Sequence, residues 1–242
     1  AKPANDLLDQ RDMLVADLNK LVRVNVVTEA DGSYNVFIGT GQSLVVGVTT
    51  LTLTSRPSTE DPTNVEIGYK VGATTVLLPA EYLQGGELGG LLAFRSQTLD
   101  PAQNQLGRVA TVLADTFNAQ HRLGQDLKGA LGGDFFNVPQ ALVQSRTTNG
   151  GNGVIGATLT DVGALAASDY RITFTGGNYL VLRLSDNTQQ TFATLPQTVD
   201  GVTLNLVSGA PNSGDSFLVQ PTRYAARDVR VSLTDTALIA AA

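Results

Sequence analysis

The amino-acid sequence predicts an α+β fold in two domains. Residues 1–139 are expected to form a helical domain with a small inserted antiparallel β-hairpin element, and residues 140–242 an all-β domain, a sandwich or an open barrel. Three observations support this. Apolar residues recur at helical spacing in two segments, and they alternate at strand spacing between those segments. In the C-terminal part, Lys and Glu disappear while Thr becomes abundant, so β-branched residues replace strong helix formers.

The first helix is predicted over residues 5–21. Leu7, Leu14 and Leu21 are spaced by seven, with Leu18 beside them, and Asn5 or Asp6 can serve as the N-cap. Several Asp residues lie near its start, where the helix dipole favours negative charge. They are interpreted as a solvated face.

After Val22 the apolar period changes to two. Val24 and Val26, then Tyr34, Val36 and Ile38, flank Asp31-Gly32, a strong hairpin signal. Turns rich in Gly and Pro separate the further predicted strands, which are Ser43–Val46, Thr50–Thr54, Val65–Val71 and Thr75–Leu78.

Helix is predicted to return over residues 88–123. Leu92, Leu99, Leu106 and Leu113 form a seven-residue repeat that places one apolar stripe along the helix. Asp100-Pro101 is typical of an N-cap followed by Pro at the first helical position, so two helices or one kinked helix are expected. Residues 125–139 are predicted to be loop. We expect the two helical segments to pack together and to bury a set of apolar side chains: Leu14, Leu18, Leu106, Leu113 and Phe117.

The β domain is predicted to contain about seven short strands. They follow a polar segment, Thr147–Gly153, that is interpreted as a flexible linker. The predicted strands are Gly156–Leu159, Tyr170–Phe174, Tyr179–Leu184, Gln190–Phe192, Val202–Val207, Phe217–Gln220 and Arg230–Leu233.

Composition limits the possible functions. The net charge of −6 argues against a nucleic-acid or anionic-membrane partner. The absence of Cys excludes disulfides, thiolate metal sites and cysteine nucleophiles. The sequence contains no run of 18 apolar residues, so a transmembrane helix is not predicted.

Three patterns could carry chemistry, and each has a simpler structural interpretation. Gly151, Gly153 and Gly156 have the spacing of a dinucleotide-binding motif. That motif requires a helix directly after the glycines, and none is predicted there. His121 is the only histidine, and its place near a helix end favours a structural role. Two pairs of carboxylates, Asp126 with Asp134 and Asp100 with Asp115, have no spacing that brings them together. We therefore expect no enzyme activity, and no catalytic, cofactor-binding or metal-binding residues.

Several segments resemble the FlgK family of bacterial flagellar hook-associated proteins. They are Ala4-Asn5-Asp6-Leu7-Leu8-Asp9-Gln10-Arg11-Asp12, Gly39-Thr40-Gly41-Gln42-Ser43-Leu44-Val45, Gly85–Asn118, Phe117-Asn118-Ala119-Gln120-His121, Gly124-Gln125-Asp126-Leu127, Ala167-Ser168-Asp169-Tyr170 and Gly214–Arg223. The family's terminal helices, which pack in the axial core, do not match either end. The resemblance thus indicates a central fragment made of part of the helical domain and an outer β domain.

The resemblance implies a structural joint of the bacterial flagellum, which adapts hook to filament by side-by-side packing of subunits. Its implied partners are the hook protein, other hook-associated proteins and neighbouring copies, and its implied location is extracellular after export by the flagellar type III apparatus. The isolated fragment is expected to be a monomer. An alternative is an adhesion module whose β domain holds a carbohydrate or a host protein. Against it, the aromatic residues lie at strand spacing suited to a core: Tyr170, Phe174, Tyr179, Phe192 and Phe217.

Overall fold

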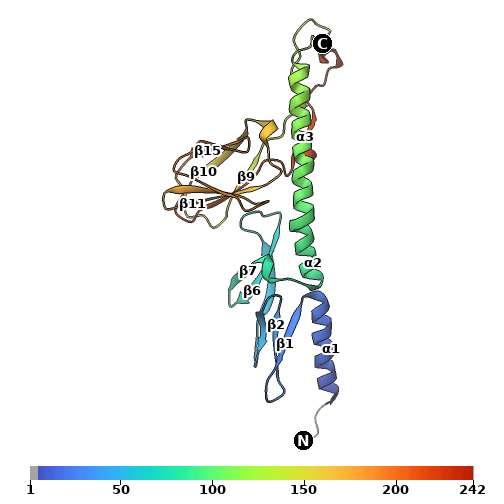
Figure 1. The fold of residues 1–242 in the computed structure, drawn as a ribbon, viewed down its shortest axis with the longest axis vertical. Coiled ribbons are helices and arrows are strands. Elements are labelled where there is room, and N and C mark those ends of the chain that lie inside the picture. Colours follow the sequence, from blue (N-terminus) through green and yellow to red (C-terminus); the bar gives the residue numbers. More distant parts are fainter. Residues whose placement is uncertain (1–4, 242) are drawn as a thin grey trace. The chain divides into compact units, whose positions relative to one another are not determined.

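The structure, a computed structural model, describes residues 5–241 (Figure 1). The chain divides into two compact units: Ala1–Ser58 with Pro62–Thr98, and Thr59–Asp61 with Leu99–Ala242. The outermost residues of the two predicted domains, 1–4 and 242, lie outside the described residues. Both sides of the predicted boundary at 139 and 140 belong to the second unit, so that boundary stays a prediction.

The first unit contains helices α1 (Asn5–Leu21) and α2 (Gly86–Phe94) and a short 3-10 helix η1 (Ala80–Tyr82). The helix predicted over 5–21 is confirmed, and α1 packs against α2. Gly86 allows this packing, because a Cβ atom there would lie 2.6 Å from the carbonyl carbon of Leu21. The two helical segments were predicted to pack together. In this unit that packing is made by α1 and α2, and α2 covers the start of the second predicted segment.

Seven strands of the first unit form two antiparallel sheets rather than the single element that was predicted. The turn between the first two uses Gly32 at φ 82°, and the Ser33 amide donates to Asp31 Oδ1 at 2.9 Å. One sheet contains, in order, β1 (Val24–Thr28), β2 (Tyr34–Ile38), β3 (Gln42–Val46) and β4 (Thr49–Thr50). The other contains β5 (Thr52–Pro57), β6 (Val65–Val71) and β7 (Thr74–Leu78).

The core of this unit is small. Val22, Ile38 and Leu83 are buried, and apolar residues from both sheets and both helices pack around them. Leu18 is half-buried at its edge, whereas Leu14 is 68% exposed. The prediction that Leu14 is buried is wrong, because α1 presents that side chain to solvent among the described residues.

The second unit begins at the end of a π-helical turn, η2 (Arg95–Leu99), which leads into helix α3 (Asp100–His121). The predicted interruption near Pro101 is present, but it occupies the five residues before Asp100. The predicted N-cap role of Asp100 is wrong. Asp100 is already helical, Leu99 holds the N-cap position, and the Asp100 carboxylate pairs with Arg223.

The β domain is a sandwich of two antiparallel sheets. The larger sheet has the strand order β13-β12-β11-β16-β9 and the smaller one β10-β15-β14. Among the strands that match no predicted segment, β9 and β14 complete these sheets, and β8 pairs with β17. The bounds are β8 (Phe136–Asn137), β9 (Leu142–Ser145), β10 (Val154–Leu159), β11 (Tyr170–Thr175), β12 (Asn178–Arg183), β13 (Gln189–Phe192), β14 (Gln197–Val199), β15 (Val202–Ser208), β16 (Ser216–Gln220) and β17 (Arg230–Val231).

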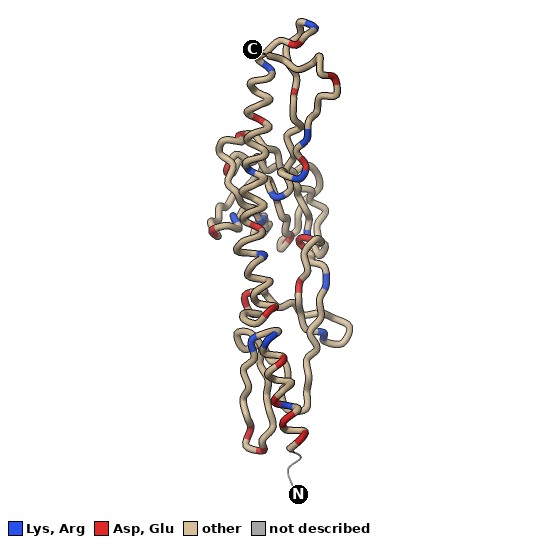
Figure 2. Tube along the Cα trace, turned by 90° about the vertical axis from the view of Figure 1, so that its right-hand side faces the viewer, with Lys and Arg blue, Asp and Glu red and all other residues tan. Residues whose placement is uncertain are grey.

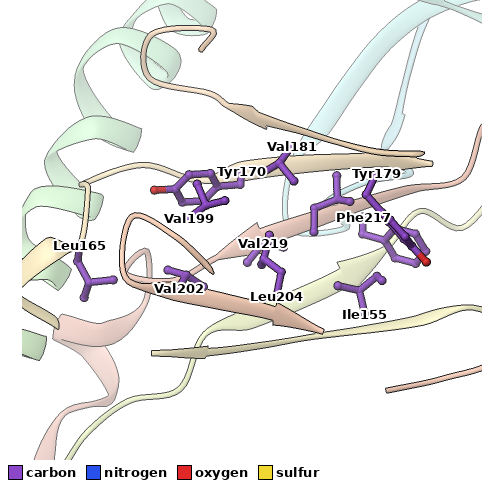
Figure 3. Packing of buried hydrophobic residues seen from close by; sticks show 11 residues of the cluster. Ile155, Leu165, Tyr170, Tyr179, Val181, Val199, Val202, Leu204, Phe217 and Val219 are labelled. Atoms are coloured by element: carbon purple, nitrogen blue, oxygen red, sulfur yellow. The ribbon is translucent and has the colours of Figure 1, made fainter. Parts of the chain in front are cut away.

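The sandwich core lies between the two sheets (Figure 3). Ile172 and Val219 from the larger sheet meet Val202 and Leu204 from the smaller one, and all four are at most 1% exposed. Of the five aromatic residues noted in the sequence, Tyr170, Tyr179 and Phe217 are buried in this core, and Phe174 and Phe192 pack against it. Aromatic residues buried in a core are unavailable for binding a sugar.

Three short helices complete the second unit: η3 (Val162–Ala164), α4 (Ala225–Asp228) and η4 (Thr236–Leu238). The general prediction of an α+β fold that ends in an all-β part is confirmed. Within residues 5–241, no helix is long and apolar enough to cross a membrane.

Candidate functional site

Helix α3 has one covered face, and that face is not the apolar one. Its buried residues are small or polar and recur at spacings of three and four: Asn104, Gly107, Thr111, Ala114, Asn118 and His121. This spacing places them in one stripe along the helix. The covered face is therefore defined by polar contacts with the rest of the second unit.

Asn118 makes the clearest of these contacts. Its side-chain amide donates to the Phe136 carbonyl oxygen at 2.7 Å, and its Oδ1 accepts from the Phe136 amide at 2.8 Å. The side chain is fully buried. Asn118 thus completes the backbone bonding of Phe136 as a neighbouring strand would, and it holds β8 on the helix.

His121 closes the C-terminal end of α3. Its Nδ1 lies 2.7 Å from the Gly133 carbonyl oxygen, and its Nε2 accepts from the Ala240 amide at 2.9 Å. The neutral tautomer with the proton on Nδ1 satisfies both bonds. The structural role predicted for His121 is consistent with this arrangement, which leaves neither ring nitrogen available for catalysis or a metal.

The apolar stripe of α3 lies in solvent among the described residues. The exposed fractions are 61% for Leu106, 63% for Val109 and 61% for Leu113. Phe117, at the end of the stripe, is 42% exposed, and its ring contacts Phe135 and Phe136. The prediction that Leu106, Leu113 and Phe117 are buried is wrong. The seven-residue repeat identifies an apolar face, but the second unit covers α3 on its polar face instead. Val109, Val112 and Leu113, with Gln105, Arg108 and Thr116 beside them, line a shallow groove on the exposed side.

Charge is sparse on this helix. Its 22 residues include three charged side chains, Asp100, Arg108 and Asp115. Acidic and basic residues both occur along the traces of the two units (Figure 2). The exposed stripe is therefore an apolar surface suited to packing against another apolar surface, rather than to electrostatic recognition.

Three of the four carboxylates considered as acid and base, Asp100, Asp126 and Asp134, have other partners. Arg122 Nε donates to Asp134 at 2.8 Å, and Asp126 accepts from the amides of Lys128 and Ala130 in a turn. Asp100 and Asp115 are 15 positions apart on one helix, which separates them by about 22 Å. Among residues 5–241, no three His, Asp or Glu side chains gather as ligands for a metal ion.

The glycine-rich segment is an ordered loop of the β domain. The amides of Gly150 and Gly151 donate to the two carboxylate oxygens of Asp215, at 2.8 and 3.0 Å, and Asn149 exchanges two bonds with the Ser216 backbone. The interpretation as a flexible linker is wrong, because Asp215, more than 60 residues away, fixes it. Strand β10 follows it where dinucleotide binding would require a helix.

A helix whose polar face is satisfied within its own chain, and whose apolar heptad face is left in solvent, is typical of a subunit in a larger protein assembly. Comparisons with known proteins identify the family of this chain. Residues 1–136 match the family model for the helical domain of flagellar hook-associated protein FlgK, and residues 144–221 match that for the D2-like domain of flagellar hook-associated protein 1. The chain therefore belongs to the FlgK family of flagellar hook-associated proteins.

Individual relatives agree with this assignment. The chain is 41% identical to flagellar hook-associated protein 1 of Escherichia coli K12 over 244 residues, which is 98% of this chain and 44% of that protein. It is 24% identical to the protein of the same name from Buchnera aphidicola over 90% of this chain and 41% of that one. The crystal structure of the flagellar hook junction protein FlgK from Burkholderia pseudomallei is 39% identical and superposes with a TM-score of 0.89, again over 98% and 44% of the two chains. The chain thus spans less than half the length of these relatives.

The covered polar face of α3 was not among the features predicted from the sequence. A pattern in the sequence does mark this face. Its small and polar residues are spaced by seven, as the leucines are, in two series: Asn104, Thr111 and Asn118, and Gly107, Ala114 and His121. A stripe of small and polar residues can mark close packing against backbone. Because the leucine repeat is apolar, the leucine face was predicted to be the buried one.

Proposed function

We propose that this chain is part of a junction protein that joins the flagellar hook to the filament by side-by-side packing of subunits. Membership of the FlgK family supports this proposal, as does the junction function named for its relative from Burkholderia pseudomallei. The observation that carries it is the exposed apolar stripe on α3, because an assembly subunit needs such a surface and an isolated soluble domain does not.

The stripe fits a helical partner. Leu99, Leu106 and Leu113 are exposed and repeat every seven positions, and such a repeat packs as knobs into the holes of a facing helix. Complete burial of a leucine stabilises a contact by about 1.5–3 kcal/mol. Several such residues can hold two helices together without any charged contact. The facing helix would come from the rest of the protein or from a neighbouring subunit.

The remaining parts of the proposal follow from this structural role. The protein acts without catalytic chemistry and without a cofactor, which the structural bonds made by His121 and by the candidate carboxylates support. Its partners are the hook protein, other hook-associated proteins and copies of itself. Its place is outside the cell in the flagellum, after export by the flagellar type III apparatus.

Swimming of bacteria that carry substitutions in the full-length protein tests the proposal. Leu106→Glu together with Leu113→Glu places two charges in the stripe and is expected to abolish filament attachment and swimming. Ala119→Glu is the matched control, since Ala119 is exposed on α3 but lies away from both stripes. The purified 242-residue chain with the double substitution should keep its circular dichroism spectrum, because both leucines are already exposed in it. Normal swimming of the double variant would contradict the proposal.

A further inference from the structure

A second feature of α3 concerns the β domain rather than assembly partners. The sandwich core draws its residues from the two sheets and the adjoining loops, and neither apolar cluster of the described residues includes a side chain of α3. The contact between this helix and the β domain must therefore be held by something other than a shared apolar core. Buried polar side chains lie at this contact.

Arg223 is at the centre of that contact. Its guanidinium is paired with Asp169 of the β domain and with Asp100 at the start of α3, and Nη1 also lies 3.2 Å from Gln103 Oε1. The Arg223 side chain is 10% exposed and that of Asp169 is 4% exposed. One buried cation thus connects two carboxylates that come from the two parts.

The same contact includes a close approach of backbone to backbone. The Thr222 hydroxyl donates to Asn104 Oδ1 at 3.1 Å, and a Cβ atom at Gly107 would lie 1.7 Å from the Thr222 carbonyl oxygen. Thr222 is fully buried and Asn104 is 4% exposed. Only glycine at position 107 lets the loop lie this close to the helix.

We infer that Asp100, Asn104, Gly107, Asp169, Thr222 and Arg223 form a polar lock that holds the β domain on α3 in a single orientation. Apolar contacts tolerate sliding, because dispersion and burial are non-directional. The lock is directional, since Arg223 must face both carboxylates while Thr222 faces Asn104. Any rotation of the β domain on the helix would leave a buried charge unpaired, which is costly.

This inference goes beyond the proposed function. It concerns how this chain sets the direction of its own β domain, and it does not depend on what covers the apolar stripe. A rigid outer domain would present the same surface in every copy of a repeating assembly.

The distance between two spin labels in the 242-residue chain tests the lock. Because the chain has no Cys, Val109→Cys on the exposed face of α3 and Gln190→Cys on β13 give one labelling site in each part. Double electron–electron resonance should then give one narrow distance distribution. Arg223→Met and Arg223→Lys should broaden it, the latter because an ammonium cannot reproduce the planar fork that faces two carboxylates.

Two further variants make the test decisive. Gly107→Ala alters only the helix side of the lock, and it should broaden the distribution while the near-ultraviolet circular dichroism of the sandwich tyrosines stays unchanged. Arg227→Met is the matched control: Arg227 is four residues from Arg223 and its side chain is 68% exposed. It pairs with its neighbour Asp228 and lies over the Tyr224 ring, and it contributes nothing to the lock. The substitution should leave the distribution narrow.

If Arg223→Met unfolds the sandwich, Gly107→Ala and Arg223→Lys decide the question. An unchanged narrow distribution in Gly107→Ala and in every folded Arg223 variant would overturn the inference, and the junction role would be unaffected. Equal broadening by Arg227→Met would also overturn it, since any loss of charge in this segment would then loosen the domain.

Discussion

Replacing Asn118 with Ala should destabilise the chain far more than replacing an apolar-stripe leucine. The substitution removes both bonds to the Phe136 backbone and leaves its N–H and C=O groups without those partners. A buried polar group left unpaired costs about 1–3 kcal/mol. Alanine returns roughly 0.5 kcal/mol through its higher helix propensity. For the two groups together, the expected loss in the free energy of unfolding is therefore about 1.5–5.5 kcal/mol.

Leu113→Ala is the matched comparison on the same helix. Leu113 is 61% exposed, so roughly two-fifths of its possible burial is realised, and its truncation should cost about 1 kcal/mol or less. Urea unfolding followed by far-ultraviolet circular dichroism measures both losses, and exchange of the Phe136 amide reports the local effect. The reasoning is refuted if Leu113→Ala costs as much as Asn118→Ala, because the covered face would then be the apolar one.

Three further predictions concern other parts of the chain. Burial would raise the pKa of Asp215, but the three amides that donate to it lower its pKa below 3.8. Its stabilisation should thus be complete above about pH 4 and should disappear as the pH falls through the lower folded pKa. Asp215→Asn at neutral pH should accordingly reduce amide protection at Gly150 and Gly151, and unchanged protection would contradict this. A fragment of residues 140–235 should show dispersed amide resonances and a cooperative melt, whereas a random-coil spectrum would place the boundary elsewhere. Light scattering coupled to size exclusion should show the 242-residue chain as a monomer at micromolar concentration. The reason is that small lateral interfaces seldom offset the translational and rotational freedom that two subunits lose on association. A stable dimer would contradict this prediction.

Local sequence patterns predicted most of the secondary structure. The helix over 5–21, the Asp31-Gly32 hairpin and the strand Val65–Val71 were placed almost to the residue, because each depends on periodicity and turn chemistry within a few residues. Strands β9 and β14 were missed. They have four and three residues, too few for alternation to be recognised, and pairing with β16 and β15 defines them.

Long-range contacts account for the remaining errors. The segment around Gly150 was interpreted as flexible because its composition is that of a linker, and Asp215 lies too far along the chain to enter a local pattern. The burial of α3 was assigned to the wrong face for a related reason. Periodicity shows which face of a helix is apolar, but not whether this chain supplies the surface that covers it.

The charged groups of the polar lock have shifted pKa values that could not be predicted from the sequence. Burial raises the pKa of Asp169, and the bonds and charge of Arg223 offset this only in part. Burial likewise disfavours the charged form of Arg223, yet its hydrogen bonds and ion pairs with Asp169 and Asp100 outweigh that effect and raise its pKa. Such mutual dependence arises only once residues 100, 169 and 223 are brought together by the fold.

Thiol labelling of the apolar stripe tests the central claim most directly. Because the 242-residue chain lacks Cys, Leu113→Cys and, as control, Ala119→Cys each give it a single reactive site. The same two substitutions are made in the full-length protein, which is then labelled in assembled flagella. Both thiols should react readily with a maleimide in the isolated chain. In flagella, the thiol at position 113 should be protected while the thiol at position 119 still reacts. Equal reactivity of Leu113→Cys in the chain and in flagella would contradict the claim that this face of α3 is a packing surface.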